Sequence, residues 1–93
     1  MRIEVVTASV ELPQLCERLR TAGIANYTVF RSVHGLGERG QQGGVDLTGV
    51  SENSYLLTTC TREQLPRIIE VIRQVLSEFG GECLVSEAMR IKH

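Results

Sequence analysis

Residues 54–79 read SYLLTTCTREQLPRIIEVIRQVLSEF, and this stretch decides the fold because it holds one strand and one helix in succession. The segment 54–60 is short and rich in β-branched and aromatic side chains, which is typical of a strand. Thr61 and Gln64 form the T-x-x-Q pattern of a capping box, which predicts that a helix begins there. Apolar side chains at three- and four-residue spacing predict one buried stripe along that helix. The stripe consists of Leu65, Ile68, Ile69, Ile72, Val75, Leu76 and Phe79.

The residues on both sides extend this plan. The pair Gly80-Gly81 ends the helix, and residues 83–91, CLVSEAMRI, predict a last strand. Near the start of the chain, residues 2–7, RIEVVT, predict a buried strand. A helix with apolar positions at Leu12, Leu15, Cys16 and Leu19 follows, Gly23 ends it in a left-handed cap, and residues 26–33 predict a strand.

The order strand–helix–strand, repeated once, predicts an α+β fold of the ferredoxin-like βαββαβ kind. Two helices pack on one face of a four-stranded antiparallel sheet in this fold. A chain of 93 residues is one domain, 1–93, and it is too short to supply a third layer. The second face of the sheet is therefore expected to pack against another subunit.

The composition excludes several classes of protein. Ten Lys and Arg are interleaved with eleven Asp and Glu, so the chain lacks the basic stripe of a nucleic-acid binder. No apolar run reaches the length of a membrane span, and no signal peptide is visible, so we expect a cytoplasmic protein. The cysteines, Cys16, Cys60 and Cys83, are widely separated and are interpreted as small buried side chains without metal-site spacing.

The central segment, residues 34–53, reads HGLGERGQQGGVDLTGVSEN and contains six glycines without a sustained period. Connections of this length are usually functional or disordered. Gly35, Gly37 and Gly40 leave the backbone bare, so its N–H groups can approach an anion, and Arg39 adds a forked donor. The G-x-G-x-x-G spacing runs into more Gly and Gln rather than into a helix, which excludes a dinucleotide fold. A mobile solubilising connection is the other interpretation.

The stretch 23–40, GIANYTVFRSVHGLGERG, resembles the PII signal-transduction family. The residues that carry the resemblance are Gly23, Ile24, Thr28, Val29, Gly35 and Gly37, together with the Gly-Gly turn before the last strand. The resemblance implies a homotrimer with adenine nucleotides in the clefts between subunits, and a T-loop, here residues 34–53, that reports to a partner. The nucleotide-binding residues it implies are Val6, Thr28, Gly35, Gly37, Glu38, Arg39, Gly40, Thr59, Gly80 and Gly81.

Two departures from the family pattern make the expected nucleotide more specific. The turn at Gly80-Gly81-Glu82 has no lysine, and the chain ends at His93, near where the family supplies further arginines. Less positive charge at the triphosphate end favours ADP or AMP over ATP. Compact PII-like proteins are associated with inorganic-carbon uptake and carboxysomes, and some bind bicarbonate. The resemblance therefore implies a transporter or carboxysome-related protein as the partner of residues 34–53.

Other functions fit the sequence less well. No Ser-His-Asp or Cys-His set is evident, and residues 7–12 lack the phosphate loop of acylphosphatases, so we do not expect an enzyme. The alternative is a metal-binding trimer of the CutA kind, with ligands from His34, Cys16 or Cys83. A copper titration distinguishes it from a PII-like nucleotide binder. An amino-acid sensor of the ACT kind needs a glycine after the first strand, where this chain has none.

Overall fold

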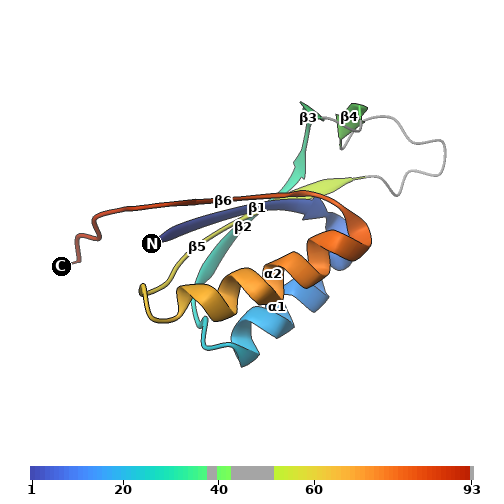
Figure 1. Ribbon diagram of the computed structural model, residues 1–93. Helices are drawn as coiled ribbons and strands as arrows, with labels where there is room; N and C mark the ends of the chain where they lie inside the picture. The colour runs from blue at the N-terminus through green and yellow to red at the C-terminus, as the bar shows by residue number, and fades with distance from the viewer. Residues whose placement is uncertain (38–39, 43–51, 93) are drawn as a thin grey trace.

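The structure, a computed structural model, describes residues 1–37, 40–42 and 52–92. The first half consists of strand β1 (Arg2–Ala8), the short 3-10 helix η1 (Ser9–Glu11), helix α1 (Leu12–Thr21) and strand β2 (Tyr27–Val33). Two three-residue strands follow, β3 (Gly35–Gly37) and β4 (Gly40–Gln42). The second half consists of strand β5 (Asn53–Thr59), helix α2 (Leu65–Phe79) and strand β6 (Glu82–Ser86) (Figure 1).

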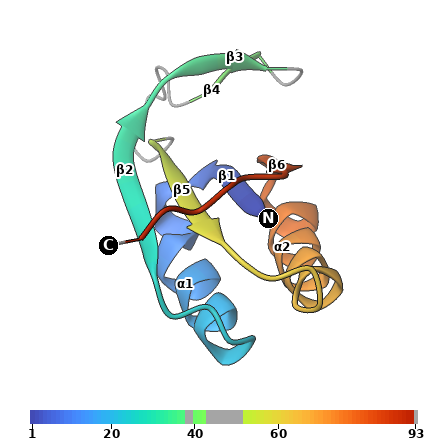
Figure 2. The ribbon, with the colours of Figure 1, turned by 90° about the vertical axis from the view of Figure 1, so that its left-hand side faces the viewer.

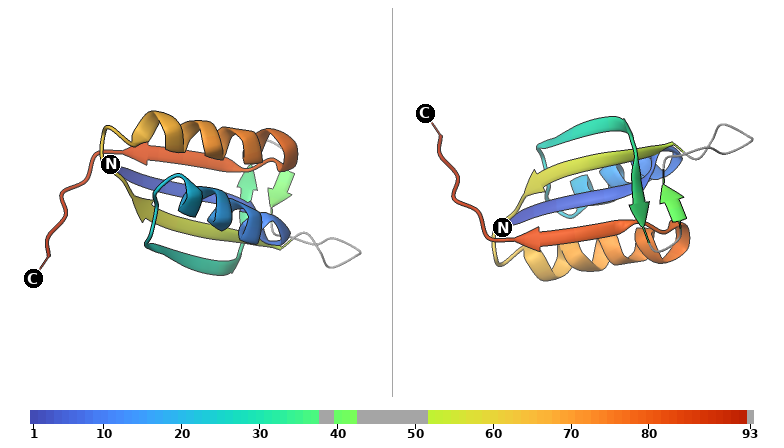
Figure 3. Two further views of the ribbon diagram at one scale, coloured as in Figure 1. Left: turned by 90° about the horizontal axis from the view of Figure 1, so that it is seen from below. Right: turned by 90° about the horizontal axis from the view of Figure 1, so that it is seen from above.

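The main sheet has four strands in the order β2-β5-β1-β6, and each neighbouring pair is antiparallel. Both helices lie against the same face of this sheet (Figures 1 and 3). The predicted ferredoxin-like sandwich is therefore confirmed. No helix of the described residues covers the other face, which is called the open face below.

Alternation along the strands builds the core between the sheet and the helices. Ile3 and Val5 of β1 and Leu56 of β5 point toward the helices and are buried, while the residues between them face the open side. The helices supply the opposite wall of the core. The buried apolar side chains of the described residues are Ile3, Val5, Leu12, Leu15, Leu19, Ile24, Leu56, Cys60, Ile68, Ile72 and Val75.

The predicted end of α1 at Gly23 is confirmed by its hydrogen bonds, whereas α2 begins at Leu65 and not at the predicted Thr61. Gly23 has φ +106°, its N–H donates to Arg20 O at 3.0 Å, and Ile24 N–H donates to Leu19 O at 2.9 Å. This is the Schellman motif. At the other helix, Thr61 N–H donates to Gln64 Oε1 at 2.9 Å and Gln64 N–H donates to Thr61 Oγ1 at 3.2 Å, as in a capping box. The box closes a turn, and α2 itself begins after it.

The last strand is shorter than predicted. β6 ends at Ser86 rather than at Ile91, because Ser86 pairs with Arg2, the first residue of β1, and no strand continues beyond it. Residues 87–92 leave the sheet without regular structure. They run away from the end of the sheet at which β6 begins (Figure 1).

Some burial predictions were wrong. Phe79, the last residue of α2, is 40% exposed, because it lies one turn beyond Val75, the last fully buried side chain of that helix. Cys60 is buried as expected, but Cys16 and Cys83 are only half-buried, and all three thiols are free. Burial raises the pKa of the Cys60 and Cys83 thiols.

The central segment contains regular structure that the sequence did not predict. β3 and β4 pair as an antiparallel hairpin, with Gly35 opposite Gln42 and Gly37 opposite Gly40. The hairpin continues from β2 and rises beside the open face, at the end of the sheet where β6 begins (Figures 1 and 2).

Candidate functional site

Three of the predicted site residues lie on the open face. Val6 of β1 is paired with Tyr55, Thr28 of β2 is paired with Leu57, and Thr59 ends β5. Val6 and Thr59 are half-buried positions between buried ones, and Thr28 pairs with Leu57, which alternates with the buried Leu56 and Thr58, so all three lie on the side away from the helices. Val6 is not a neighbour of Thr59, however. Tyr55 and Thr59 are four residues apart on β5, which puts Val6 and Thr59 about 13 Å apart along the strands.

Gly80 and Gly81 lie against the end of β1. Gly80 O accepts a hydrogen bond from Thr7 Oγ1 at 3.3 Å. A Cβ on Gly81 would lie 2.2 Å from Val6 O and 2.9 Å from Leu76 Cδ2. Both glycines have positive φ, +78° and +123°. This turn therefore brings backbone close to Val6 where any side chain would be excluded.

Three predicted glycines lie in the hairpin. Gly35 and Gly37 are strand residues of β3, and Gly40 begins β4. The central segment was expected to be a connection without strands, but these three glycines belong to the β3–β4 ladder. Glu38 and Arg39 lie outside the described residues.

Hydrogen bonds close the base of the central segment. Ser32 has φ +60°, and the pairing of β2 with β5 shifts register between Arg31 and Val33, which bends β2 toward the hairpin. Ser32 Oγ donates to Glu52 Oε1 at 2.9 Å, and Ser9 N–H donates to Glu52 O at 2.8 Å. The chain thus enters and leaves the segment at one fixed point. We call these contacts the serine clamp.

A cavity at the opposite end of the open face brings Thr28 and Thr59 together. Its volume is about 270 Å³. Arg2 and Arg90 also line it, as do Tyr27 and Thr58, so four hydroxyl-bearing residues and two arginines border one space. Arg2 Nε already donates to Ser86 Oγ at 3.1 Å and lies 3.2 Å from Glu4 Oε1. Of the two, Arg90 is the cation that no ion pair within the described residues engages, and this donor set suits an anionic ligand.

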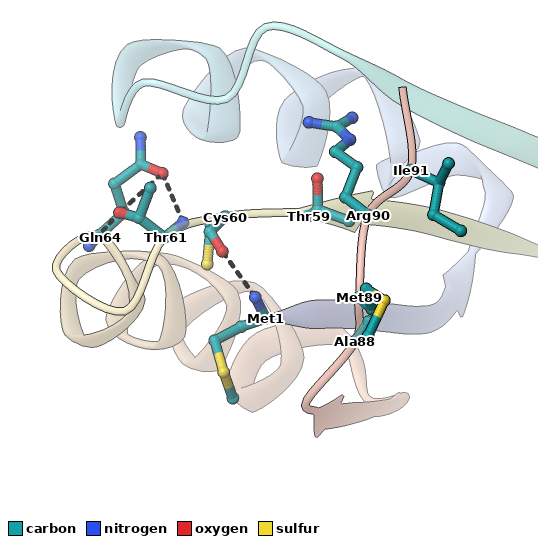
Figure 4. Close-up of a pocket in the computed structure, with 9 residues that line it drawn as sticks. All are labelled: Met1, Thr59, Cys60, Thr61, Gln64, Ala88, Met89, Arg90 and Ile91. Atoms are coloured by element: carbon teal, nitrogen blue, oxygen red, sulfur yellow. Dashed lines mark hydrogen bonds between the residues drawn. The ribbon is translucent and has the colours of Figure 1, made fainter. Parts of the chain in front are cut away.

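A larger cavity of about 540 Å³ adjoins the first and shares Thr59 and Arg90 with it (Figure 4). Its lining also includes Met1, whose amino group donates to Cys60 O at 2.8 Å. In Figure 4 the Arg90 side chain extends toward Thr59, while Ile91 projects from the other side of the chain. Residues 87–92 therefore contribute the guanidinium group of Arg90 to the lining of both cavities.

The open face between the two ends is mainly apolar. The rings of Phe30 and Tyr55 are 5.8 Å apart, and Phe30 and Leu84 are more than half exposed. Tyr55 Oη donates to Glu4 Oε2 at 2.9 Å. Burial raises the pKa of Tyr55, and the hydrogen bond to the Glu4 carboxylate raises it further.

The predicted residues thus divide into two half-sites. The loop-base half comprises Val6, Gly80 and Gly81 beside the hairpin, and the threonine half comprises Thr28, Thr59 and Arg90. The two halves lie at opposite ends of one open face, so a single subunit does not bring them together. Sequence reasoning left the role of Arg90 undecided, because only the folded chain places residues 87–92 beside β5.

Two other kinds of feature are absent from the described part of the chain. No three His, Cys, Asp or Glu side chains within residues 1–37, 40–42 and 52–92 come together as metal ligands. None of the helices described is long and apolar enough to span a bilayer.

The chain matches one protein family over its whole length. A family model described as "Nitrogen regulatory protein P-II" matches residues 1–93. A search of curated protein sequences gives no significant match.

Among solved structures, the chain is similar to CPII, a nitrogen regulatory PII-like protein from Thiomonas intermedia K12 bound to ADP, AMP and bicarbonate. That match has a TM-score of 0.77 and 15% identity, and it covers 89% of this chain and 79% of that chain. The apo form of CPII gives a TM-score of 0.71 at 13% identity, covering 91% and 84%. A PII-like signaling protein from Thermus thermophilus gives 0.69 at 20% identity, covering 89% and 80%. At these identities the likeness shows the fold.

Proposed function

The chain belongs to the nitrogen regulatory protein P-II family, and on that premise we propose that it is a regulatory sensor that assembles as a homotrimer. The observation that supports assembly is the open face, where Phe30 and Leu84 are 55% and 57% exposed on a sheet whose two helices both lie on the other side (Figure 3). Apolar side chains gathered on one uncovered face mark an interaction site. Three such faces packed together would bury them.

The ligand that we propose is an adenine nucleotide, bound between subunits. The single observation that carries this proposal is the division of the site into two half-sites at opposite ends of the open face. A cleft formed by the loop-base half of one subunit and the threonine half of the next would contain the residues of both half-sites. The loop-base half would hold the phosphates against bare backbone, and Arg90 would approach from the second subunit.

ADP or AMP fits this site better than ATP. Glu82 follows Gly81 directly and pairs with Val6, so the loop-base half carries a carboxylate and no lysine. A third phosphate would add negative charge near that carboxylate. CPII, which shares the fold, has been crystallised with ADP, AMP and bicarbonate. We propose bicarbonate as a second, smaller ligand of the same cleft.

The central segment, residues 34–53, is the proposed output of the sensor. The serine clamp fixes both ends of this segment next to the loop-base half. Occupation of the cleft would therefore act directly on its base. We propose that it contacts a protein partner in inorganic-carbon metabolism, a transporter or a carboxysome-related protein, in the cytoplasm. The protein would act by binding and not by catalysis.

Arg90→Ala is expected to weaken ADP binding by roughly ten- to a hundredfold, because one charge-assisted hydrogen bond contributes about 1.5–3 kcal/mol. Isothermal titration of ADP, AMP and ATP, with and without bicarbonate, measures this. Arg67→Ala is the matched control, since Arg67 is an exposed arginine on α2. Absence of binding by any adenine nucleotide below millimolar concentration, or unchanged affinity in Arg90→Ala, contradicts the proposal. A copper titration of the same sample tests the CutA-like alternative.

Arg39→Ala is expected to reduce ADP affinity by a similar factor, roughly ten- to a hundredfold, if Arg39 supplies a second forked donor to the phosphates. The same titration measures the change. The double variant with Arg90→Ala shows whether the two arginines contact one ligand, because their effects then depart from additivity. If the Arg39→Ala protein binds ADP as tightly as the parent, Arg39 does not belong to the proposed site.

A further inference from the structure

Residues 87–92 are held in place at their first residue and carry exposed apolar side chains further on. Glu87 forms an ion pair with Arg62 of the turn before α2, which holds the start of the segment. Beyond it, Met89 and Ile91 are each 88% exposed. The next most exposed large apolar side chain in the described part of the chain is Val10, at 61%. Two alternate apolar residues left this bare indicate a surface that another molecule covers.

Neighbouring side chains of this segment point in different directions. Arg90 points toward Thr59, and Ile91 projects the other way (Figure 4). Met89 and Ile91 border the larger cavity together with Arg90, but most of each apolar side chain is left bare.

A groove between α2 and β6 offers a matching surface. Its volume is about 450 Å³. Ile69, Leu76 and Val85 are among the side chains that line it, and Gly81 lies where β6 begins. β6 is an edge strand of the four-stranded sheet, so the N–H and C=O groups on its outer side have no strand beside them among the described residues. A free strand edge beside an apolar groove accepts an extended segment.

The segment cannot lie along the groove of its own subunit without reversing direction. β6 runs from Glu82 near Gly81 to Ser86, and residues 87–92 continue away from that end (Figure 1). The groove of a second copy is within reach in the proposed assembly. Gly81 belongs both to the loop-base half and to the groove, so a subunit that delivers Arg90 to that half brings the adjacent residues to the mouth of the groove. Neighbouring Cα atoms are only about 3.8 Å apart.

We propose that residues 88–92 of one subunit dock as an extended segment into the α2–β6 groove of a second copy, with Met89 and Ile91 as the apolar anchors. This inference rests on the proposed function and adds a positioning role to it. Docking holds Arg90 at the loop-base half of the second copy. Glu82 beside the groove offers a carboxylate to the two cations that the segment carries, Arg90 and Lys92.

The first test removes the two anchors and leaves Thr28, Thr59 and Arg90 of the threonine half in place. The double variant Met89→Ser, Ile91→Ser is expected to bind ADP at least tenfold more weakly, because two apolar side chains no longer hold Arg90 in place. Both side chains are almost fully exposed, so the subunit itself stays folded. Val10→Ser removes an exposed apolar side chain from η1 and is expected to bind ADP like the parent. An anchor variant with the affinity of the parent overturns the inference.

The second test detects the contact directly and does not depend on nucleotide. Cys83 lines the groove. In a Met89→Cys variant, a short bis-maleimide is expected to join the introduced thiol to Cys83 of another subunit, giving covalent dimers and trimers on a denaturing gel. Adding Cys83→Ser is expected to abolish these products. Val10→Cys with the same reagent is the control for chance cross-linking.

The outcomes separate the two proposals. If the parent binds no adenine nucleotide but Met89→Cys cross-links through Cys83, the nucleotide proposal fails and the docking stands. If the parent binds ADP, and Met89→Cys gives no product that depends on Cys83, the docking is wrong and the nucleotide proposal stands.

Discussion

Gly81→Ala is expected to lower the free energy of unfolding by about 3 kcal/mol, combining backbone strain with an overlap in a packed region. The new Cβ would lie 2.2 Å from Val6 O and 3.2 Å from Thr7 Cα, and neither atom is free to move, because β1 is the inner strand between β5 and β6. The φ of +123° is also unfavourable for any residue with a side chain. Urea denaturation at one fixed protein concentration measures the loss.

Gly23→Ala is the matched control for this prediction. Gly23 has a similarly positive φ, +106°, but its added Cβ would meet only the end of the Gln64 side chain at 3.3 Å. The flexible amide can move aside, so the expected loss is about 1 kcal/mol from the backbone alone. The difference between the two variants isolates the contact with β1. Equal losses at both positions would show that the approach of Gly81 to Val6 does not stabilise the fold.

Leu84→Lys is expected to convert the proposed trimer into folded monomers. Leu84 is 57% exposed on the open face and pairs with Glu4, so a lysine there has a favourable neighbour in the isolated subunit. In the trimer the ammonium group would be buried against another subunit, and each such charge costs several kcal/mol. Association is expected to weaken by about a thousandfold or more. Sedimentation equilibrium at micromolar concentration measures it.

Val10→Lys provides the control for this second prediction. Val10 is 61% exposed, as bare as Leu84, but it lies on η1 and not on the open face. The variant is expected to keep the oligomeric state of the parent. Thermal melts of both variants show whether the subunits remain folded. A Leu84→Lys protein that stays trimeric, or a parent that is monomeric, means that the open face is not the interface.

The parts of the fold that depend on local patterns could be predicted from the sequence. The apolar stripe of α2, the Schellman motif at Gly23 and the Thr61–Gln64 box are each written within a few neighbouring residues. Periodicity and capping residues therefore located both helices to within a few residues.

The parts that depend on distant residues could not be predicted. The end of β6 is set by Arg2, more than eighty residues earlier, because a strand cannot extend past its partner. The β3–β4 hairpin pairs glycines and glutamines that show no apolar alternation, so nothing in their pattern indicated strands. Arg90 meets Thr28 and Thr59 only after three elements come together. Such contacts follow from tertiary structure and leave no local signal.

The serine clamp has a consequence for how this protein can evolve. Because Ser32, Ser9 and Glu52 close the central segment before it leaves the sheet, insertions and deletions within it need not disturb the four strands. The entropy of closing a flexible loop grows slowly, by only about 0.6 kcal/mol for each doubling of its length. Selection can therefore lengthen, shorten or rewrite these residues at little cost to folding. Descendants of one ancestral chain are free to change these residues while the four-stranded sheet and its helices are inherited unchanged.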